Sequence, residues 1–141
     1  MIQYHKPVLL EESVSGLEIK PDGIYVDATF GGGGHSQEIL KNLGQGRLIA
    51  FDQDQEVLQN TIDDERFILI NHNFRYIKNF LKYYDMTHVD GILADLGLSS
   101  RHIDKAERGS TFKADSDLHM RMNRNKKLTA KDIINRYRQE Q

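Results

Sequence analysis

The chain has 141 residues, enough for one domain with a modest core, and it has no cysteine, which excludes a disulfide framework and a thiolate metal site. Hydrophobic residues make up 38% of it, but no apolar run is long enough to cross a membrane, so we expect a soluble, cytoplasmic protein. The net charge of −2 is uneven, because residues 1–100 carry 15 acidic and 8 basic side chains whereas residues 101–141 carry 6 and 11.

The first hundred residues predict alternating helices and strands. A short helix is expected from Pro7 to Leu17, another over Ser36–Leu43, a third after Asp54 as its N-cap, and a fourth along the apolar stripe from Tyr76 to Tyr84. The apolar runs that predict strands are Ile24–Val26, Arg47–Phe51, Phe67–Ile70 and Val89–Ala94. Alternation at this spacing is typical of an α/β, Rossmann-like fold with parallel strands and right-handed crossovers.

A glycine-rich turn follows the first predicted strand. Asp27 closes that strand, and four successive glycines, residues 31–34, lead into His35 and the next helix. Glycine lets the backbone turn tightly and approach a ligand that a Cβ atom would exclude. Asp52 ends the following strand, where an acidic side chain can accept hydrogen bonds from both hydroxyls of a ribose. The pattern predicts an adenosine-containing cofactor, with an ordinary βα turn as the alternative interpretation.

The charges around this turn favour S-adenosyl-L-methionine as that cofactor. A carboxylate at the mouth of the turn, from Asp27, would repel a pyrophosphate but would suit a ligand that carries an ammonium or sulfonium group. No G-x-x-x-x-G-K-[ST] motif occurs, which excludes a P-loop nucleotidase. We therefore expect Asp27, Gly31, Gly33 and Gly34 to bind the cofactor.

After Asp95 the character of the sequence changes. Residues 97–127 show little periodicity, so they predict a long and functional loop. Thr129 then opens a helix, with Asp132 at the position of a capping box. The six histidines include no pair at helical ligand spacing, so no metal site is proposed.

Several segments together resemble the bacterial small-subunit ribosomal RNA (cytosine-N4)-methyltransferase family. They are HKPVLLEESV, VDATFGGGGHS, FDQD, DGILADLGLSS, ERG and MRM. The resemblance implies a class I methyltransferase sheet, interrupted after its fourth strand by a helical insert. It extends over nearly the whole chain but only the first half of a family member, so we interpret the chain as an N-terminal fragment with weak or no activity. Residues 1–100 would form an S-adenosylmethionine-binding half-domain, and residues 101–141 the active-site loop and the beginning of the insert.

The resemblance also implies roles for individual residues. It places Gly33, Gly34 and His35 against the methionine part of the cofactor, Asp52 at the ribose and Phe74 beside the adenine. Asp95 lies near the reacting end, and His102 falls where the family has another polar contact with the cofactor. Phe74 as a core residue and His35 as an ordinary helix residue are the alternatives. The expected RNA contacts are Lys113, Arg121, Arg124, Lys126 and Lys127, although a solvated surface would explain the basic charge equally well. The active-site loop departs from the family pattern at Ser110, Asp117 and His119.

The implied reaction transfers a methyl group to the N4 amine of a cytidine. That amine is a poor nucleophile because its lone pair is delocalised, so an acceptor for one of its hydrogens would help. Asp95 is the predicted acceptor, with Ser99 or Ser100 orienting a base that has been unstacked from the RNA. Alternatively, Asp95 binds the cofactor or caps the following loop.

Two other functions fit the same residues. One is a non-catalytic S-adenosylmethionine-binding module, and the other is a small-molecule methyltransferase, which the basic arm disfavours. The expected macromolecular partner is ribosomal RNA in the small subunit. A second copy of the chain is a further candidate partner, because a homodimer would cover the open edge of a four-stranded sheet.

Overall fold

The computed structural model describes residues 7–98 and 103–138, and the chain divides into two compact units, Met1–Leu96 and Gly97–Gln141. The first unit contains the strands β1 (Ile24–Asp27), β2 (Arg47–Phe51), β3 (Phe67–Ile70) and β4 (Gly91–Leu93) and the helices α1 (Leu10–Gly16), α2 (Gly34–Asn42) and α3 (Ile77–Tyr83), with the 3₁₀ helices η1 (Gln55–Asn60) and η2 (Phe74–Tyr76). The second contains η3 (Ala106–Arg108) and α5 (Ala130–Arg136). None of the helices in the described ranges combines the length and apolarity needed to cross a membrane.

The strands of the first unit form one parallel sheet in the order β3-β2-β1-β4. The predicted α/β fold with parallel strands is therefore confirmed. At the carboxyl end of β1, Asp27 is paired with Ala50 of β2 on one side and with Leu93 of β4 on the other. Residues that follow β1, β2 and β4 consequently emerge at the same edge of the sheet.

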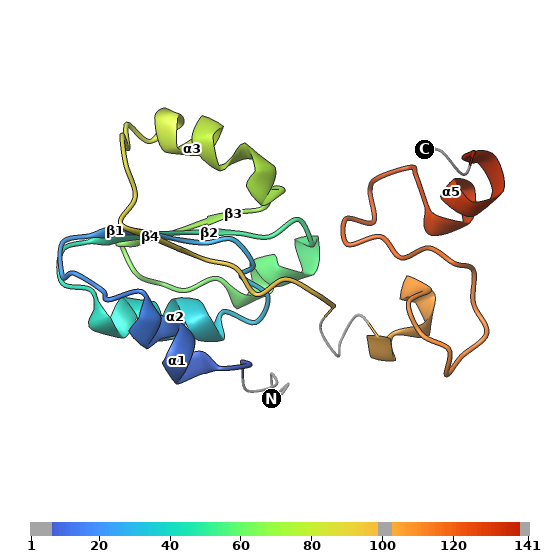
Figure 1. Cartoon of the computed structure of the whole chain (residues 1–141), viewed down its shortest axis with the longest axis horizontal. Coiled ribbons are helices and arrows are strands. Elements are labelled where there is room, and N and C mark those ends of the chain that lie inside the picture. The colour runs from blue at the N-terminus through green and yellow to red at the C-terminus, as the bar shows by residue number, and fades with distance from the viewer. Residues whose placement is uncertain (1–6, 99–102, 139–141) are drawn as a thin grey trace. The chain divides into compact units, whose positions relative to one another are not determined.

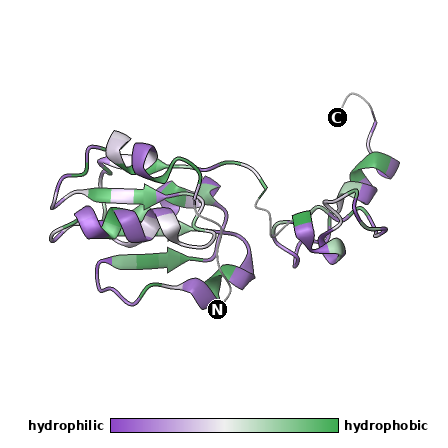
Figure 2. Cartoon of the chain, turned by 90° about the horizontal axis from the view of Figure 1, so that it is seen from below, coloured by the Kyte–Doolittle hydropathy of each residue, from purple (hydrophilic) through white to green (hydrophobic). Residues whose placement is uncertain are grey.

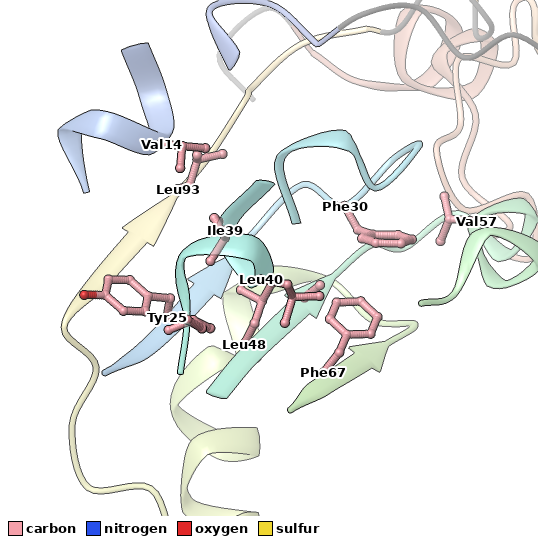
Figure 3. Close-up of a cluster of buried hydrophobic side chains, with 11 residues drawn as sticks. Val14, Tyr25, Phe30, Ile39, Leu40, Leu48, Val57, Phe67 and Leu93 are labelled. Atoms are coloured by element: carbon pink, nitrogen blue, oxygen red, sulfur yellow. The ribbon is translucent and has the colours of Figure 1, made fainter. Parts of the chain in front are cut away.

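Helices cover both faces of this sheet, with α1 and α2 on one face and α3 on the other (Figure 1). Successive strand residues point to opposite faces, so β1, β2 and β3 contribute to two cores, whereas β4 contributes Leu93 to the core on the α2 side. The strands stand out as apolar in Figure 2. The core on the α2 side includes Tyr25, Ile39, Leu40, Leu48 and Phe67 (Figure 3). The core on the α3 side includes Val26, Ile49, Phe51, Ile70 and Phe80.

Arg66 ties the end of α2 to the start of β3. Its Nη1 donates to the carbonyl oxygens of Leu43 and Gly44 at 2.6 and 3.1 Å, which satisfies acceptors that the end of a helix leaves without partners. Its Nη2 and Nε donate to the Asp64 carboxylate at 2.6 and 2.9 Å. These bonds from Arg66 lower the pKa of Asp64 to about 2.

The expected boundaries of two helices are wrong. The first helix begins at Leu10 instead of Pro7, because Leu9 adopts a left-handed conformation with φ of 50° that interrupts the helix. The helix expected after Asp54 is the 3₁₀ helix η1, Gln55–Asn60, in which Val57 packs into the core and Leu58 is exposed. The predicted N-cap is confirmed, since the Asp54 side chain accepts a hydrogen bond from the backbone N–H of Glu56 at 3.0 Å.

The fourth strand is shorter than predicted, covering Gly91–Leu93 within the expected range 89–94. Its only partner among the described strands is β1, and its three residues pair with Tyr25–Asp27. The pairing ends with Asp27 because the chain leaves β1 there to enter the glycine turn.

The second unit is mainly irregular over residues 103–127, as the lack of periodicity predicted. The predicted capping box at the start of α5 is confirmed. Asp132 N–H donates to the Thr129 hydroxyl, and Thr129 N–H donates to the Asp132 carboxylate, both at 3.1 Å. The helix itself is short and ends at Arg136.

Replacing Arg66 by alanine should lower the free energy of unfolding, because its hydrogen bonds to the Asp64 carboxylate and to two carbonyl oxygens at the end of α2 are lost. Urea unfolding of the chain measures this change. Arg47→Ala, at the exposed start of β2, is the matched control and should change the stability little. Equal losses in the two variants would show that Arg66 does not hold α2 to β3.

Candidate cofactor site

Three aspartates gather at the carboxyl edge of the sheet because β1, β2 and β4 run parallel. Asp27 is the last residue of β1, Asp52 directly follows β2, and Asp95 lies two residues beyond β4. The glycine turn, residues 31–34, leaves β1 at the same edge and enters α2. The structure thus brings together the turn and the acids that the sequence singled out.

Asp27 holds the turn together from inside the protein. Its side chain is completely buried, and its two carboxylate oxygens accept hydrogen bonds from the Ser36 hydroxyl at 2.7 Å and from the Thr29 N–H at 3.0 Å. Burial raises the pKa of Asp27, and these two hydrogen bonds oppose the rise. The sequence did not predict this burial, in which α2 and the turn enclose the carboxylate. Contact of Asp27 with a cofactor stays a prediction.

Asp52 fastens the glycine turn to the end of β2. Its Oδ2 accepts a hydrogen bond from the Gly31 N–H, and its Oδ1 accepts one from the Asp54 N–H, both at 2.9 Å. The side chain is half-buried. A carboxylate has about four lone-pair sites, so each oxygen retains the capacity to accept from a ribose hydroxyl. Asp52, which is predicted to bind the ribose, is thus hydrogen-bonded to the glycine turn, which is predicted to contact the methionine part.

Two positions of the turn require glycine for geometric reasons. Gly33 has φ of 80°, and a Cβ atom there would lie 2.9 Å from the Phe30 ring. At Gly34 a Cβ atom would overlap Pro7. Gly31 has φ of 51° but open space around it, so its constraint is conformational alone. The tight turn that the sequence predicted is present, and the close approach of its backbone to a ligand stays a prediction.

His35 and Phe74 differ in exposure. His35 is buried, and its Nε2 lies 3.2 Å from the carbonyl oxygen of Val8, which can only accept, so Nε2 carries the proton. The ring thereby holds the segment before α1 against the start of α2. Phe74 opens η2 and is 41% exposed, which excludes the core alternative for this ring. Contact of Phe74 with an adenine and of His35 with a methionine group remain predictions.

Asp95 is exposed, and its backbone is fixed by a residue that the sequence analysis did not select. The Asp95 N–H donates to the hydroxyl of Thr29 at 2.7 Å. Thr29 is recognisable in the sequence only as a polar residue shortly after the strand, which is a weak signal. The predicted Ser99, Ser100 and His102 lie outside the described residues.

The predicted RNA-binding residues of the second unit differ in their exposure and in whether their side chains pair with other groups. Lys113, Lys126 and Lys127 are exposed. Arg121 is half-buried, and its Nη1 donates to the carbonyl oxygen of Lys126 at 2.6 Å while its Nη2 lies 2.9 Å from His119 Nδ1. Arg124 pairs with Glu107 at 3.2 Å. The three lysines are therefore the more available cations of this set.

Two of the three departures from the family pattern take part in bonds that hold the second unit together. Besides the contact of His119 with Arg121, the Asp117 carboxylate accepts from Lys131 Nζ at 2.9 Å, which lowers the pKa of Asp117. Ser110 is half-buried, and its Oγ lies 3.5 Å from the carbonyl oxygen of Arg108. A hollow of about 430 Å³ in this unit is lined by residues 109, 111–116 and 118. No described residue of the glycine turn contributes to that hollow.

The family model described as the MraW methylase family matches residues 2–141. The chain belongs to the MraW methylase family. Its relatives include the ribosomal RNA small subunit methyltransferase H of Christiangramia forsetii, 58% identical over all of this chain and 47% of that protein. Proteins of the same name from Bacteroides thetaiotaomicron and Flavobacterium johnsoniae are each 56% identical, over 99% of this chain and 46% of theirs. The chain thus spans about half the length of these curated relatives, and the resemblance stated from the sequence is confirmed.

Gly33→Ala should lower the free energy of unfolding by at least about 1–2 kcal/mol, because alanine disfavours a left-handed backbone and its methyl group would press on the Phe30 ring. Denaturant unfolding measures the effect. The matched control is Gly16→Ala, at the end of α1, where a Cβ atom meets nothing within 4 Å. If both variants have the same stability, the turn does not require glycine at position 33.

The raised pKa of Asp27 predicts a stability that declines with rising pH. In the folded state the carboxyl keeps its proton to a higher pH than in the unfolded state, so its contribution is complete below about pH 4 and is lost as the pH rises through the folded-state pKa. Asp27→Asn removes the titrating group and should flatten this decline in unfolding measurements made from about pH 4 to 8. Asp22→Asn, an exposed control, should leave it unchanged. Identical slopes for the parent chain and Asp27→Asn would contradict the assignment.

Proposed function

We propose that this chain provides the S-adenosyl-L-methionine-binding part of a methyltransferase that acts on the N4 amine of a cytidine in small-subunit ribosomal RNA. The observation that carries the proposal is the hydrogen bond between Asp52 and the glycine turn at the carboxyl edge of a parallel sheet. Membership of the MraW methylase family and the names of the relatives support the reaction class and the RNA substrate.

The cofactor would lie along the carboxyl edge of β1 and β2. Asp52 would accept the ribose hydroxyls, and the methionine part would lie against the backbone of the glycine turn, where the Cβ position of Gly31 is open. The exposed ring of Phe74 offers a face for the adenine. These residues come from the turn after β1, the end of β2 and the segment after β3, and all belong to the first unit.

When bound, the cofactor supplies the methyl group, and the residues of the chain position the acceptor. Methyl transfer is an in-line displacement in which positioning alone can contribute about 7–11 kcal/mol. Asp95 would accept a hydrogen bond from the cytidine amine and localise its lone pair, and it would take up the proton afterwards. The exposure of Asp95 at the same edge as the glycine turn leaves its carboxylate accessible to such a base.

The second unit would contribute electrostatic attraction for the RNA backbone. Lys113, Lys126 and Lys127 are exposed cations in a part of the sequence with 11 basic and 6 acidic side chains. Phosphate contacts by lysine give affinity without base specificity, and they weaken as the salt concentration rises. Specificity for one cytidine is therefore assigned to the edge of the first unit where Asp95 lies.

Calorimetric titration tests the cofactor. The chain should bind S-adenosyl-L-methionine in preference to NAD, and Asp52→Ala should weaken that binding about tenfold or more, because hydrogen bonds to a charged acceptor are lost. Asp63→Ala, which removes an exposed carboxylate from the first unit, is the matched control and should bind like the parent chain. Preference for NAD, or equal binding by both variants, would refute the proposed cofactor site.

Transfer of a radiolabelled methyl group tests the substrate. Small ribosomal subunits are incubated with labelled cofactor and either this chain or the full-length relative from Christiangramia forsetii. The full-length protein should label cytidine N4 in the RNA, and this chain should label it weakly or not at all. Absence of RNA label with the full-length protein refutes the substrate. Cofactor binding by this chain without transfer, beside an active full-length relative, is the result expected of the cofactor-binding part of such an enzyme.

A further inference from the structure

We propose that Thr29 is a positioning residue that fixes Asp95 against the reacting end of the cofactor. The inference rests on the proposed function, because it assigns Thr29 a purpose only if Asp95 faces the methyl-bearing sulfur. Thr29 itself need not touch cofactor or substrate.

A continuous set of hydrogen bonds connects the buried core of the site with Asp95. The Asp27 carboxylate accepts from the Thr29 N–H at 3.0 Å, and the Thr29 hydroxyl accepts from the Asp95 N–H at 2.7 Å. A second bond runs beside it, from the Ala28 N–H to the carbonyl oxygen of Leu93 at 2.8 Å. The end of β4 is thus fastened to the turn after β1 by one backbone bond and one side-chain bond.

The hydrogen bond between the Asp95 N–H and the Thr29 hydroxyl lies beyond the last paired residues of β1 and β4. Pairing between β1 and β4 ends with Asp27 and Leu93, and Asp95 lies two residues further and is exposed. A misplacement of about 1 Å in a reacting group can cost a hundredfold in rate, so a free end of this kind would position a carboxylate poorly. The Thr29 hydroxyl extends the restraint to Asp95.

Threonine suits this purpose better than other residues of its size. Its branched Cβ restricts χ1, so the hydroxyl oxygen has fewer directions open to it than that of serine. Its backbone N–H is already anchored on a carboxylate that is completely buried. Valine has nearly the same shape but cannot accept a hydrogen bond, which makes Thr29→Val a selective deletion of the contact with Asp95.

A purely structural role of Thr29 and a positioning role predict different effects of its loss on the binding of two related ligands. S-Adenosylmethionine and S-adenosylhomocysteine share ribose, adenine and amino-acid groups and differ in the methyl group and the positive charge on sulfur. If Thr29 only stabilises the turn, its loss weakens both ligands equally. If it aims the Asp95 carboxylate at the sulfonium, its loss weakens the charged ligand selectively.

The test is calorimetric titration of both ligands against the parent chain, Thr29→Val, Thr29→Ser, Asp95→Asn and the double variant Thr29→Val/Asp95→Asn. Thr29→Val should bind S-adenosylmethionine about threefold to tenfold more weakly, the effect of one lost hydrogen bond, with a change of less than about twofold for S-adenosylhomocysteine. Thr29→Ser should retain most of the affinity. In the Asp95→Asn background the valine substitution should have no further effect, because the two residues act as one unit.

Thr87→Val, which removes an exposed hydroxyl next to His88, is the matched control and should bind both ligands like the parent chain. If Thr29→Val does not fold, Thr29→Ala makes the same deletion without the added methyl group and is read in the same way. Equal losses for both ligands, or an undiminished effect in the Asp95→Asn background, overturn the inference and leave the proposed function intact. Failure of the parent chain to bind S-adenosylmethionine contradicts the proposed function and overturns the inference with it.

Discussion

The buried carboxylate of Asp27 is the interaction on which the arrangement of the site depends. It lies at the end of β1, between β2 and β4, and it accepts hydrogen bonds from Ser36 on α2 and from Thr29 in the turn. An acid without such donors would be costly to bury, so the turn and the helix have to close around it in one way. This closure sets the path of the glycines and the position of the Thr29 hydroxyl.

Asp52 and Asp95, the other two aspartates at the edge of the sheet, differ in burial and in hydrogen bonding. Asp52 accepts a hydrogen bond from the Gly31 N–H and is half-buried, whereas Asp95 is exposed and its backbone N–H donates to Thr29. The first is suited to a fixed part of a ligand such as a ribose, because its oxygens are already oriented by two N–H groups. The second is suited to a group that arrives from solvent. This difference in burial between the two acids is compatible with the proposed transfer between a cofactor and a large substrate.

Part of the site was predictable because its signals are local. The four glycines, the strand before them and the aspartate after the next strand are all visible in the sequence, and parallel pairing brings them together. The burial of Asp27 was not predicted, because it depends on how α2 packs over the turn and not on neighbouring residues. Thr29 was missed for a similar reason, since its partner Asp95 is 66 positions away in the sequence. Equally, the bonds of Arg121 and Arg124 depend on the folding of the second unit.

By itself the sequence determined the fold class, the order of strands and helices along the chain, the glycine turn and the membership of a methylase family, because hydrophobic periodicity and motifs are properties of adjacent residues. The tertiary structure decided which carboxylates are buried and which are exposed, where β4 ends and what holds Asp95. These properties arise from contacts between segments that are distant in the chain. They depend on desolvation and on hydrogen-bond geometry, which exist only once the sheet and its helices have packed together.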